Sequence, residues 1–251
     1  MCFACGHPSL SHGRRIARRS FLVGPAALAA ATLARDALAR TGPPAKPPPA
    51  PPKPDNVLSP DEALARLMEG NKRYRIGVAR RHDFVAERGA LVGGQNPFAA
   101  ILSCADSRVA PEYAFDSGRG DLFVVRVAGN FANPDGIASF EYAVAELKTP
   151  LLLVLGHDAC GAVKATIDSL RDKTPLPGHL PTLVEALAPG VKASAGQKGD
   201  PVENAIRENV RLTVAALKAA NPILSAAVEE RRAKVVGGVY RLSDGAVELI
   251  A

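Results

Sequence analysis

The sequence predicts an α/β fold: a mostly parallel central sheet, with about four parallel strands and a C-terminal antiparallel strand, flanked by helices. Runs that are apolar throughout, rather than at alternate positions, are typical of parallel strands buried on both faces. Three such runs occur, at 98–103 (FAAILS), 122–128 (LFVVRVA) and 151–156 (LLLVLG). A helical pattern precedes the third run, as a parallel connection requires. The hydrophobic fraction of 47% is ample for a packed core.

Residues 1–39 have the pattern of an export signal peptide. Basic residues precede an apolar stretch from Phe21 to Ala34, and an A-x-A cleavage pattern follows at 37–39. The Arg18-Arg19 pair before SFL resembles the twin-arginine export signal. We therefore expect a periplasmic protein cleaved near Ala39, with an uncleaved anchor or a tail as the alternative. An alanine-rich stretch this short is a poor membrane span.

A proline-rich linker is predicted at 40–55. Eight of the fourteen residues from 41 to 54 are proline, which fixes φ and donates no backbone hydrogen bond. Such a segment favours an extended spacer. The alternative is a ligand for a proline-binding domain.

One catalytic domain is predicted at 56–251. Its first helix begins after Ser59, a suitable N-cap, with Pro60 at the first helical position and an apolar stripe behind it. A second helical pattern lies at 136–148, and three more follow the last buried run, around 180–188, 202–220 and 222–232. Near the end, the turn at 243–245 separates two strands.

The distribution of charge argues against nucleic-acid binding. The formal net charge is +6, but residues 1–54 contain eight basic residues and one acidic residue. The remainder of the chain therefore carries a net charge of −1. A domain that binds nucleic acid would be expected to carry a basic surface. Because the positive charge lies outside the domain, the net charge does not support a nucleic-acid-binding protein.

Polar, metal-binding residue types follow two of the buried runs. Cys104 ends the first run, with Asp106 and Arg108 at alternate positions after it, and His157 and Cys160 follow the third. Because functional groups gather beyond the carboxyl ends of parallel strands, both clusters should reach the same edge. Two thiolates and an imidazole suit a tetrahedral zinc ion with one open position. The alternatives are a Cys104–Cys160 disulfide, buried cysteines that act as small hydrophobic residues, and a histidine that merely bonds a loop carbonyl.

Two further cysteines, Cys2 and Cys5, lie within the predicted signal peptide. In CFACGH, Gly6 separates the second cysteine from the histidine, which does not fit the haem-attachment pattern. We regard this pair as incidental to the domain, and a redox or metal-sensing role before export stays open.

CADSRV, followed some fifty residues later by GHDACG, resembles the paired motif of the β-class carbonic anhydrases, C-x-D-x-R and then H-x-x-C. The resemblance extends over residues 58–251. It implies the β-carbonic anhydrase fold, with Cys104, His157 and Cys160 as the ligands of one Zn²⁺ per subunit. It also implies that Asp106 and Arg108 form a catalytic pair beside the metal.

The same resemblance assigns the substrate pocket. Gln95 matches a glutamine that meets the substrate, Phe123 and Tyr142 match aromatic pocket residues, and Gly161 would offer a backbone N–H to the bound anion. Some of these residues come from the neighbouring subunit in the family, which implies a homodimer or homotetramer. Two positions depart from the family pattern: Asp158 replaces a small hydroxyl residue and Ala162 replaces a second glycine.

The resemblance implies reversible hydration of carbon dioxide to bicarbonate and a proton, by attack of a zinc-bound hydroxide. Asp106 would accept a hydrogen bond from that hydroxide. Arg108 would hold the carboxylate away from the fourth metal position. The alternatives are a hydrolase of carbon disulfide or carbonyl sulfide with the same ligands, and a non-catalytic module that binds zinc or bicarbonate.

Overall fold

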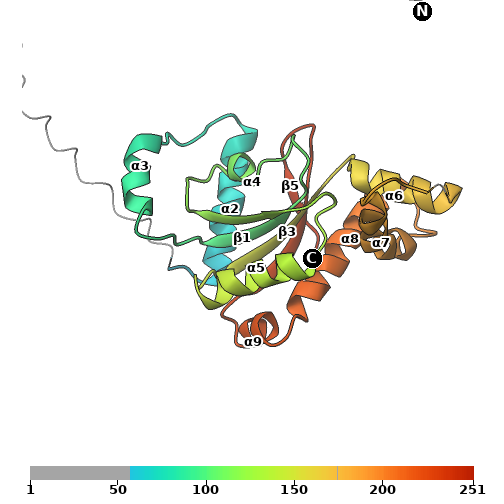
Figure 1. The fold of residues 1–251 in the computed structure, drawn as a ribbon. Helices are drawn as coiled ribbons and strands as arrows, with labels where there is room; N and C mark the ends of the chain where they lie inside the picture. The colour runs from blue at the N-terminus through green and yellow to red at the C-terminus, as the bar shows by residue number, and fades with distance from the viewer. Residues whose placement is uncertain (1–56, 174) are drawn as a thin grey trace, which may run out of the picture. The chain divides into compact units, whose positions relative to one another are not determined.

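The computed structural model describes residues 57–173 and 175–251 (Figure 1). The predicted signal peptide, with Cys2 and Cys5, and the predicted linker lie outside these residues. Among the described residues, no helix is long and apolar enough to cross a membrane.

The described residues form the predicted α/β fold around a five-stranded sheet of order β2-β1-β3-β4-β5. The strands are β1 (Ala99–Ser103), β2 (Leu122–Arg126), β3 (Leu151–His157), β4 (Lys234–Tyr240) and β5 (Val247–Leu249). The first four strands are mutually parallel, and β5 pairs antiparallel with β4. The sequence prediction of a parallel sheet with an antiparallel C-terminal strand is therefore confirmed.

Helices cover both faces of the sheet (Figure 1). They are α2 (Pro60–Arg75), α3 (Phe84–Leu91), α4 (Pro111–Ala114), α5 (Pro134–Ala145), α6 (Gly161–Asp172), α7 (Leu180–Ala193), α8 (Pro201–Lys218) and α9 (Ile223–Glu229). The sequence predicts helices that overlap the central residues of α2, α5, α7, α8 and α9. The short helices α3 and α4 were not predicted, because neither has an extended apolar stripe.

Two apolar cores sandwich the sheet, and the strands contribute to both. In β3, Leu152 and Val154 face a core shared with α5 to α9, whereas Leu151, Leu153 and Leu155 face a core shared with α2 and α4. Every residue of β3 is buried. The apolar runs of β1 and β3 therefore arise from strands covered on both sides, whereas the run at 122–128 forms the edge strand β2, which is only partly buried.

The start of α2 shows how local sequence fixes an element. The Ser59 hydroxyl accepts a hydrogen bond from the backbone N–H of Glu62, and the Glu62 carboxylate accepts one from the backbone N–H of Ser59. This reciprocal capping box satisfies backbone donors that a helix start otherwise leaves unpaired. Ala63 and Leu67, on the predicted apolar stripe, are fully buried.

Candidate metal centre

Cys104, His157 and Cys160 meet at the carboxyl edge of the sheet. Cys104 directly follows β1, His157 ends β3, and Cys160 is the N-cap of α6. Because β1 and β3 are neighbours and parallel, their ends lie side by side. The two sulfurs and a ring nitrogen all lie within 4.8 Å of one another, and all three side chains are buried. Both cysteines are free, so the predicted disulfide alternative is not what the structure contains.

His157 presents one ring nitrogen to this cluster. Its Nδ1 lies 2.8 Å from the backbone carbonyl oxygen of Asp158, to which it donates, whereas the buried Nε2 has no hydrogen-bond partner among the described residues. A bond to a loop carbonyl therefore accounts for only one of the two nitrogens. A buried polar atom without a partner is costly, and a metal ion would satisfy it. Donation through Nδ1 also leaves the Nε2 lone pair available to a cation.

The two thiols differ in acidity. A hydrogen bond from Cys160 lowers the pKa of Cys104 to about 4, against the opposing effect of burial. The Cys104 thiolate in turn raises the pKa of Cys160, and burial adds to this rise. A divalent cation between the sulfurs would displace the shared proton, since thiols that coordinate a metal are deprotonated.

Asp106 and Arg108 form a bidentate ion pair beside the triad. Arg108 Nε donates to Asp106 Oδ1 at 2.9 Å, and Arg108 Nη2 donates to Asp106 Oδ2 at 2.8 Å. Asp106 Oδ2 lies 3.8 Å from His157 Nε2, so the carboxylate faces the Cys104, His157 and Cys160 triad. The hydrogen bond from Arg108 holds the pKa of Asp106 well below its usual range. Asp106 is thus an ionised acceptor with a fixed orientation.

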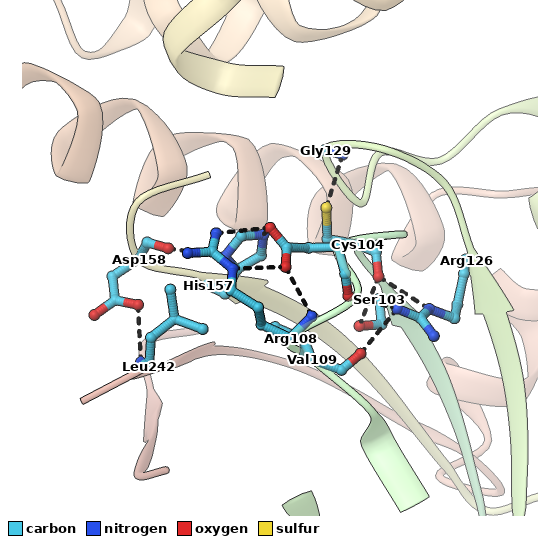
Figure 2. A network of polar contacts seen from close by, with 10 residues as sticks. Ser103, Cys104, Arg108, Val109, Arg126, Gly129, His157, Asp158 and Leu242 are labelled. Carbon is cyan, nitrogen blue, oxygen red and sulfur yellow. Dashed lines mark hydrogen bonds and ion pairs between the residues drawn. The ribbon is translucent and has the colours of Figure 1, made fainter. Parts of the chain in front are cut away.

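Arg126, which the sequence analysis missed, fixes the loop that carries Cys104 and Asp106. It is the last residue of β2, and its guanidinium donates to the carbonyl oxygens of Cys104 (3.0 Å), Asp106 (2.8 Å) and Val109 (2.8 Å). Figure 2 shows Arg126 reaching across to this loop. The sequence feature that could have revealed Arg126 is that it is the single charged residue in the apolar run LFVVRVA, near the end of the strand where the site lies.

The backbone of Gly129 also contacts the triad. Its N–H donates to the Cys104 sulfur at 3.3 Å (Figure 2), and its carbonyl accepts a hydrogen bond from buried Asn209 of α8. The φ angle of Gly129 is +88°, and a Cβ at this position would lie 2.7 Å from a methyl carbon of Leu187. Only glycine fits here, so the loop after β2 can approach the sulfur closely.

Gly161 is the first residue of α6, directly after Cys160, and it is exposed. A Cβ at this position would meet no atom within 4 Å, so packing within the chain does not require a glycine. Ala162, the second departure from the family pattern, packs against the core behind α6.

The remaining predicted pocket residues lie away from the triad within one chain. Gln95 is exposed in the loop before β1, at the amino edge of the sheet, whereas Cys104 follows the carboxyl end of the same strand. Phe123, near the start of β2, and Tyr142, on α5, are neighbours, with ring centroids 6.3 Å apart. The side chain of Tyr142 is 49% exposed. A single copy of the chain therefore does not bring Gln95 to the metal ligands.

A cavity of about 590 Å³ lies beside α3 and α4. Its lining includes Tyr74, His82, Phe84 and Tyr113, and none of the predicted site residues. Among the described residues, the side chains that could hold a metal converge at Cys104, His157 and Cys160, not in this cavity. The candidate functional site is therefore the triad.

The carbonic anhydrase family model matches residues 99–247. Carbonic anhydrase 2 of Mycobacterium tuberculosis is 40% identical over 188 residues, which are 74% of this chain and 91% of that protein. Among solved structures, a β-carbonic anhydrase of Coccomyxa in complex with acetazolamide has a TM-score of 0.59 and 26% identity, covering 74% of this chain and 86% of that one. A tetrameric β-carbonic anhydrase of Sordaria macrospora has a TM-score of 0.59 and 25% identity, covering 76% and 98%.

Proposed function

Because the chain belongs to the β-class carbonic anhydrases, we propose that it binds one zinc ion through Cys104, His157 and Cys160 and reversibly hydrates carbon dioxide to bicarbonate and a proton. One observation carries the proposal: the buried His157 Nε2, which has no hydrogen-bond partner in the described part of the chain, faces two free cysteines and an arginine-held carboxylate. The donor set fits zinc, which takes cysteine sulfur and histidine nitrogen and keeps an open position in catalytic sites.

When bound there, zinc would lower the pKa of a coordinated water to about 7, so that hydroxide is available at neutral pH. The carboxylate of Asp106 would accept a hydrogen bond from the attacking oxygen and orient one of its lone pairs toward carbon dioxide. Two anionic sulfurs neutralise a divalent charge, so a nearby acceptor of this kind is needed to favour hydroxide.

Arg108 would keep Asp106 in this role. A carboxylate is itself an acceptable zinc ligand, and an unrestrained Asp106 could take the position that the substrate water needs. Both oxygens of Asp106 accept from the guanidinium, at 2.9 and 2.8 Å, which fixes the carboxylate and keeps it ionised. The exposed backbone N–H of Gly161, at the start of α6, would meet the developing anion.

Gln95, Phe123 and Tyr142 would complete the pocket from a second copy of the chain. Their distance from the triad along the fold supports an assembly in which one subunit supplies the metal ligands and its partner supplies these side chains. The tetramers known from Sordaria macrospora agree with this arrangement. We propose a homodimer or a homotetramer.

Export through the twin-arginine route is a separate proposal, and the sequence of residues 1–39 supports it. Changing Arg18 and Arg19 to lysine should leave the protein in the cytoplasm of the native cell, whereas the unchanged chain should be recovered from the periplasm without Met1. An unchanged distribution of the variant between the two fractions would contradict the proposal.

The catalytic proposal is tested on the full chain by metal analysis together with stopped-flow hydration of carbon dioxide. We expect about one zinc per chain and rapid hydration, and we expect Cys160→Ala to lose both. Wild-type protein that is folded, free of zinc after preparation with zinc present, and inactive would end the proposal.

A further inference from the structure

Asp158, where this chain departs from the family pattern, is attached to the end of the neighbouring strand β4 and the segment after it, by both its backbone and its side chain. Its backbone N–H donates to the carbonyl oxygen of Tyr240, the last residue of β4, at 3.1 Å. Its carboxylate Oδ1 accepts from the backbone N–H of Leu242 at 2.9 Å. In Figure 2 the carboxylate points toward Leu242 and away from the metal ligands. The two bonds hold Asp158 against the segment between β4 and β5.

The carbonyl of this same residue orients His157. His157 Nδ1 donates to the Asp158 carbonyl oxygen at 2.8 Å, and this bond determines which ring nitrogen stays free for a metal. The position of the carbonyl depends on the backbone of Asp158. Whatever fixes residue 158 therefore also fixes the ring.

The loop needs such an attachment, because its backbone is strained. Ala159, between Asp158 and Cys160, has a φ of +51°, a left-handed conformation that alanine adopts at a cost. A strained turn persists only when its surroundings hold it in place. The bond from Leu242 to the Asp158 carboxylate holds the loop on one side of Ala159, and α6 holds it on the other.

The carboxylate could instead act by its charge, because Asp158 raises the pKa of the neighbouring Arg108, although Asp106 contributes most to that rise. Among the described residues, no ion pair joins Asp158 to Arg108. The hydrogen bond to Leu242 is direct, whereas the effect on Arg108 acts across space. The geometry therefore favours the hydrogen bond over the charge.

We propose that Asp158 is a positioning residue of the metal centre: its carboxylate anchors the strained His157–Cys160 loop to Leu242, and its carbonyl thereby holds the His157 ring in the orientation that binds metal. This inference rests on the metal site of the proposed function and adds a residue to it. A small hydroxyl side chain at position 158, as the family usually has, is one bond shorter than aspartate and would extend less far toward Leu242.

The test compares zinc retention in full-length protein loaded with zinc. The variants are Asp158→Ala, which removes the acceptor, and Asp158→Asn, which keeps an acceptor oxygen and removes the charge. Asp172→Ala is the matched control, because Asp172 lies exposed at the end of α6 and forms its ion pair with the exposed Arg171. The readouts are the rate of zinc loss to a chelator and the visible absorption spectrum of the cobalt-substituted protein.

We expect Asp158→Ala to lose zinc about tenfold faster than wild type and to show an altered cobalt spectrum. Asp158→Asn and Asp172→Ala should both stay within about twofold of wild type. If Asp158→Ala does not fold, Asp158→Asn still decides. Zinc loss from Asp158→Asn about tenfold faster than from wild type would show that the charge matters rather than the hydrogen bond, and would overturn the proposal. Wild-type rates and spectrum in Asp158→Ala would overturn it as well. Zinc-free wild type would instead contradict the proposed function.

Discussion

At the scale of single residues, the pairing of Asp106 with Arg108 is the feature on which the proposed chemistry depends most. Removing the guanidinium should leave the triad intact, because the Arg108 side chain is 54% exposed and its ion pair is with Asp106 rather than with Cys104, His157 or Cys160. We therefore expect Arg108→Ala to fold and to retain zinc. We expect its hydration rate to fall about 100-fold, the usual effect of losing one oriented group in an active site.

The Arg108 prediction is checked by stopped-flow hydration, with zinc content and thermal unfolding measured on the same sample. Arg108→Lys is the control for charge, because lysine cannot form the bidentate contact and should be impaired too. A zinc-loaded Arg108→Ala protein with the full hydration rate would show that the ion pair merely braces the strand end.

Residue types and spacing were enough to predict that Cys104, His157 and Cys160 meet, and the resemblance of the motif implied the Asp106–Arg108 pair. Cysteine, histidine, aspartate and arginine rarely gather at strand ends without a chemical reason, and their motif is local in sequence. Arg126 and Asp158 escaped prediction because their partners are backbone groups brought near by folding. The N–H that Asp158 binds lies 84 residues away, at Leu242, and a backbone group leaves no mark in the sequence.

At the scale of elements, α8 packs closely on the middle of the sheet because strands β3 and β4 have glycines at the positions that face it. A Cβ at Gly237 would lie 2.6 Å from Val210 Cγ1 and 3.0 Å from Val214 Cγ2, both on α8. Gly237→Ala should therefore push α8 off β4 and reduce the free energy of unfolding by about 1–3 kcal/mol.

This prediction is measured by urea unfolding of the zinc-loaded protein. Gly93→Ala is the matched control, because a Cβ there would meet nothing within 4 Å, and it should change the free energy of unfolding by less than about 0.5 kcal/mol. Equal stability of the two variants would contradict the proposed close packing.

A charged network joins α8 to β5 and to the end of β4. Glu248 accepts hydrogen bonds from Arg207 at 2.6 and 2.9 Å and from Arg241 at 3.1 Å. The hydrogen bonds from Arg207 contribute most to lowering the pKa of Glu248 to about 2, from an ordinary 4.5. Because the folded pKa is depressed, this stabilisation is fully present above pH 4.5 and is lost as the pH falls toward 2.

Glu248→Gln should therefore be less stable than wild type at pH 7, and the difference should shrink below about pH 4.5. The side chain of Glu248 is 46% exposed, so solvent screening limits the difference at pH 7 to about 1 kcal/mol or less. Urea unfolding at a series of pH values measures it. A difference that is constant from pH 7 to pH 3 would rule out this source of acid sensitivity.

Periodicity and capping predicted the elements well where an element has a long apolar pattern of its own. The continuous apolar runs predicted β1, β2 and β3, and Ser59 with Pro60 predicted the start of α2. Helix α3 has no buried residue, so it lacks the periodic stripe from which a helix is predicted. The sequence also does not indicate at which glycines a helix packs closely on the sheet, because that depends on side chains from another element.

At the scale of the whole molecule, the proposed site needs two copies of the chain. Gln95 lies at the amino edge of the sheet and Cys104 beyond its carboxyl edge, so a chain that lacks one can be complemented by a chain that lacks the other. Gln95→Ala and Cys160→Ala should each be weak or inactive alone. After subunit exchange the mixture should recover roughly a quarter of wild-type hydration, since about half the dimers are hybrids with one complete site of two, and isolated hybrid dimers should recover roughly half.

The hybrid experiment uses separate affinity tags to isolate mixed dimers. A matched control places both substitutions on one chain and mixes it with wild type. In each hybrid dimer of this mixture, the wild-type triad should be completed by a chain that carries Gln95→Ala. Absence of recovery in the first mixture, with subunit exchange verified by the tags, would place Gln95 in the same subunit as its triad. How copies assemble could not be predicted from residue patterns, because the complementary surfaces belong to two chains.

If Asp158 positions His157 as proposed, its attachment to Leu242 also determines when the metal centre can form. Cys104 and Cys160 are translated early, but the histidine ring between them is oriented only after residues 240–242 have left the ribosome and folded. A nascent chain halted before β4 would display both thiols without a firm third ligand. On this proposal, metal capture would be coupled to completion of the domain, so that maturation would follow translation instead of accompanying it.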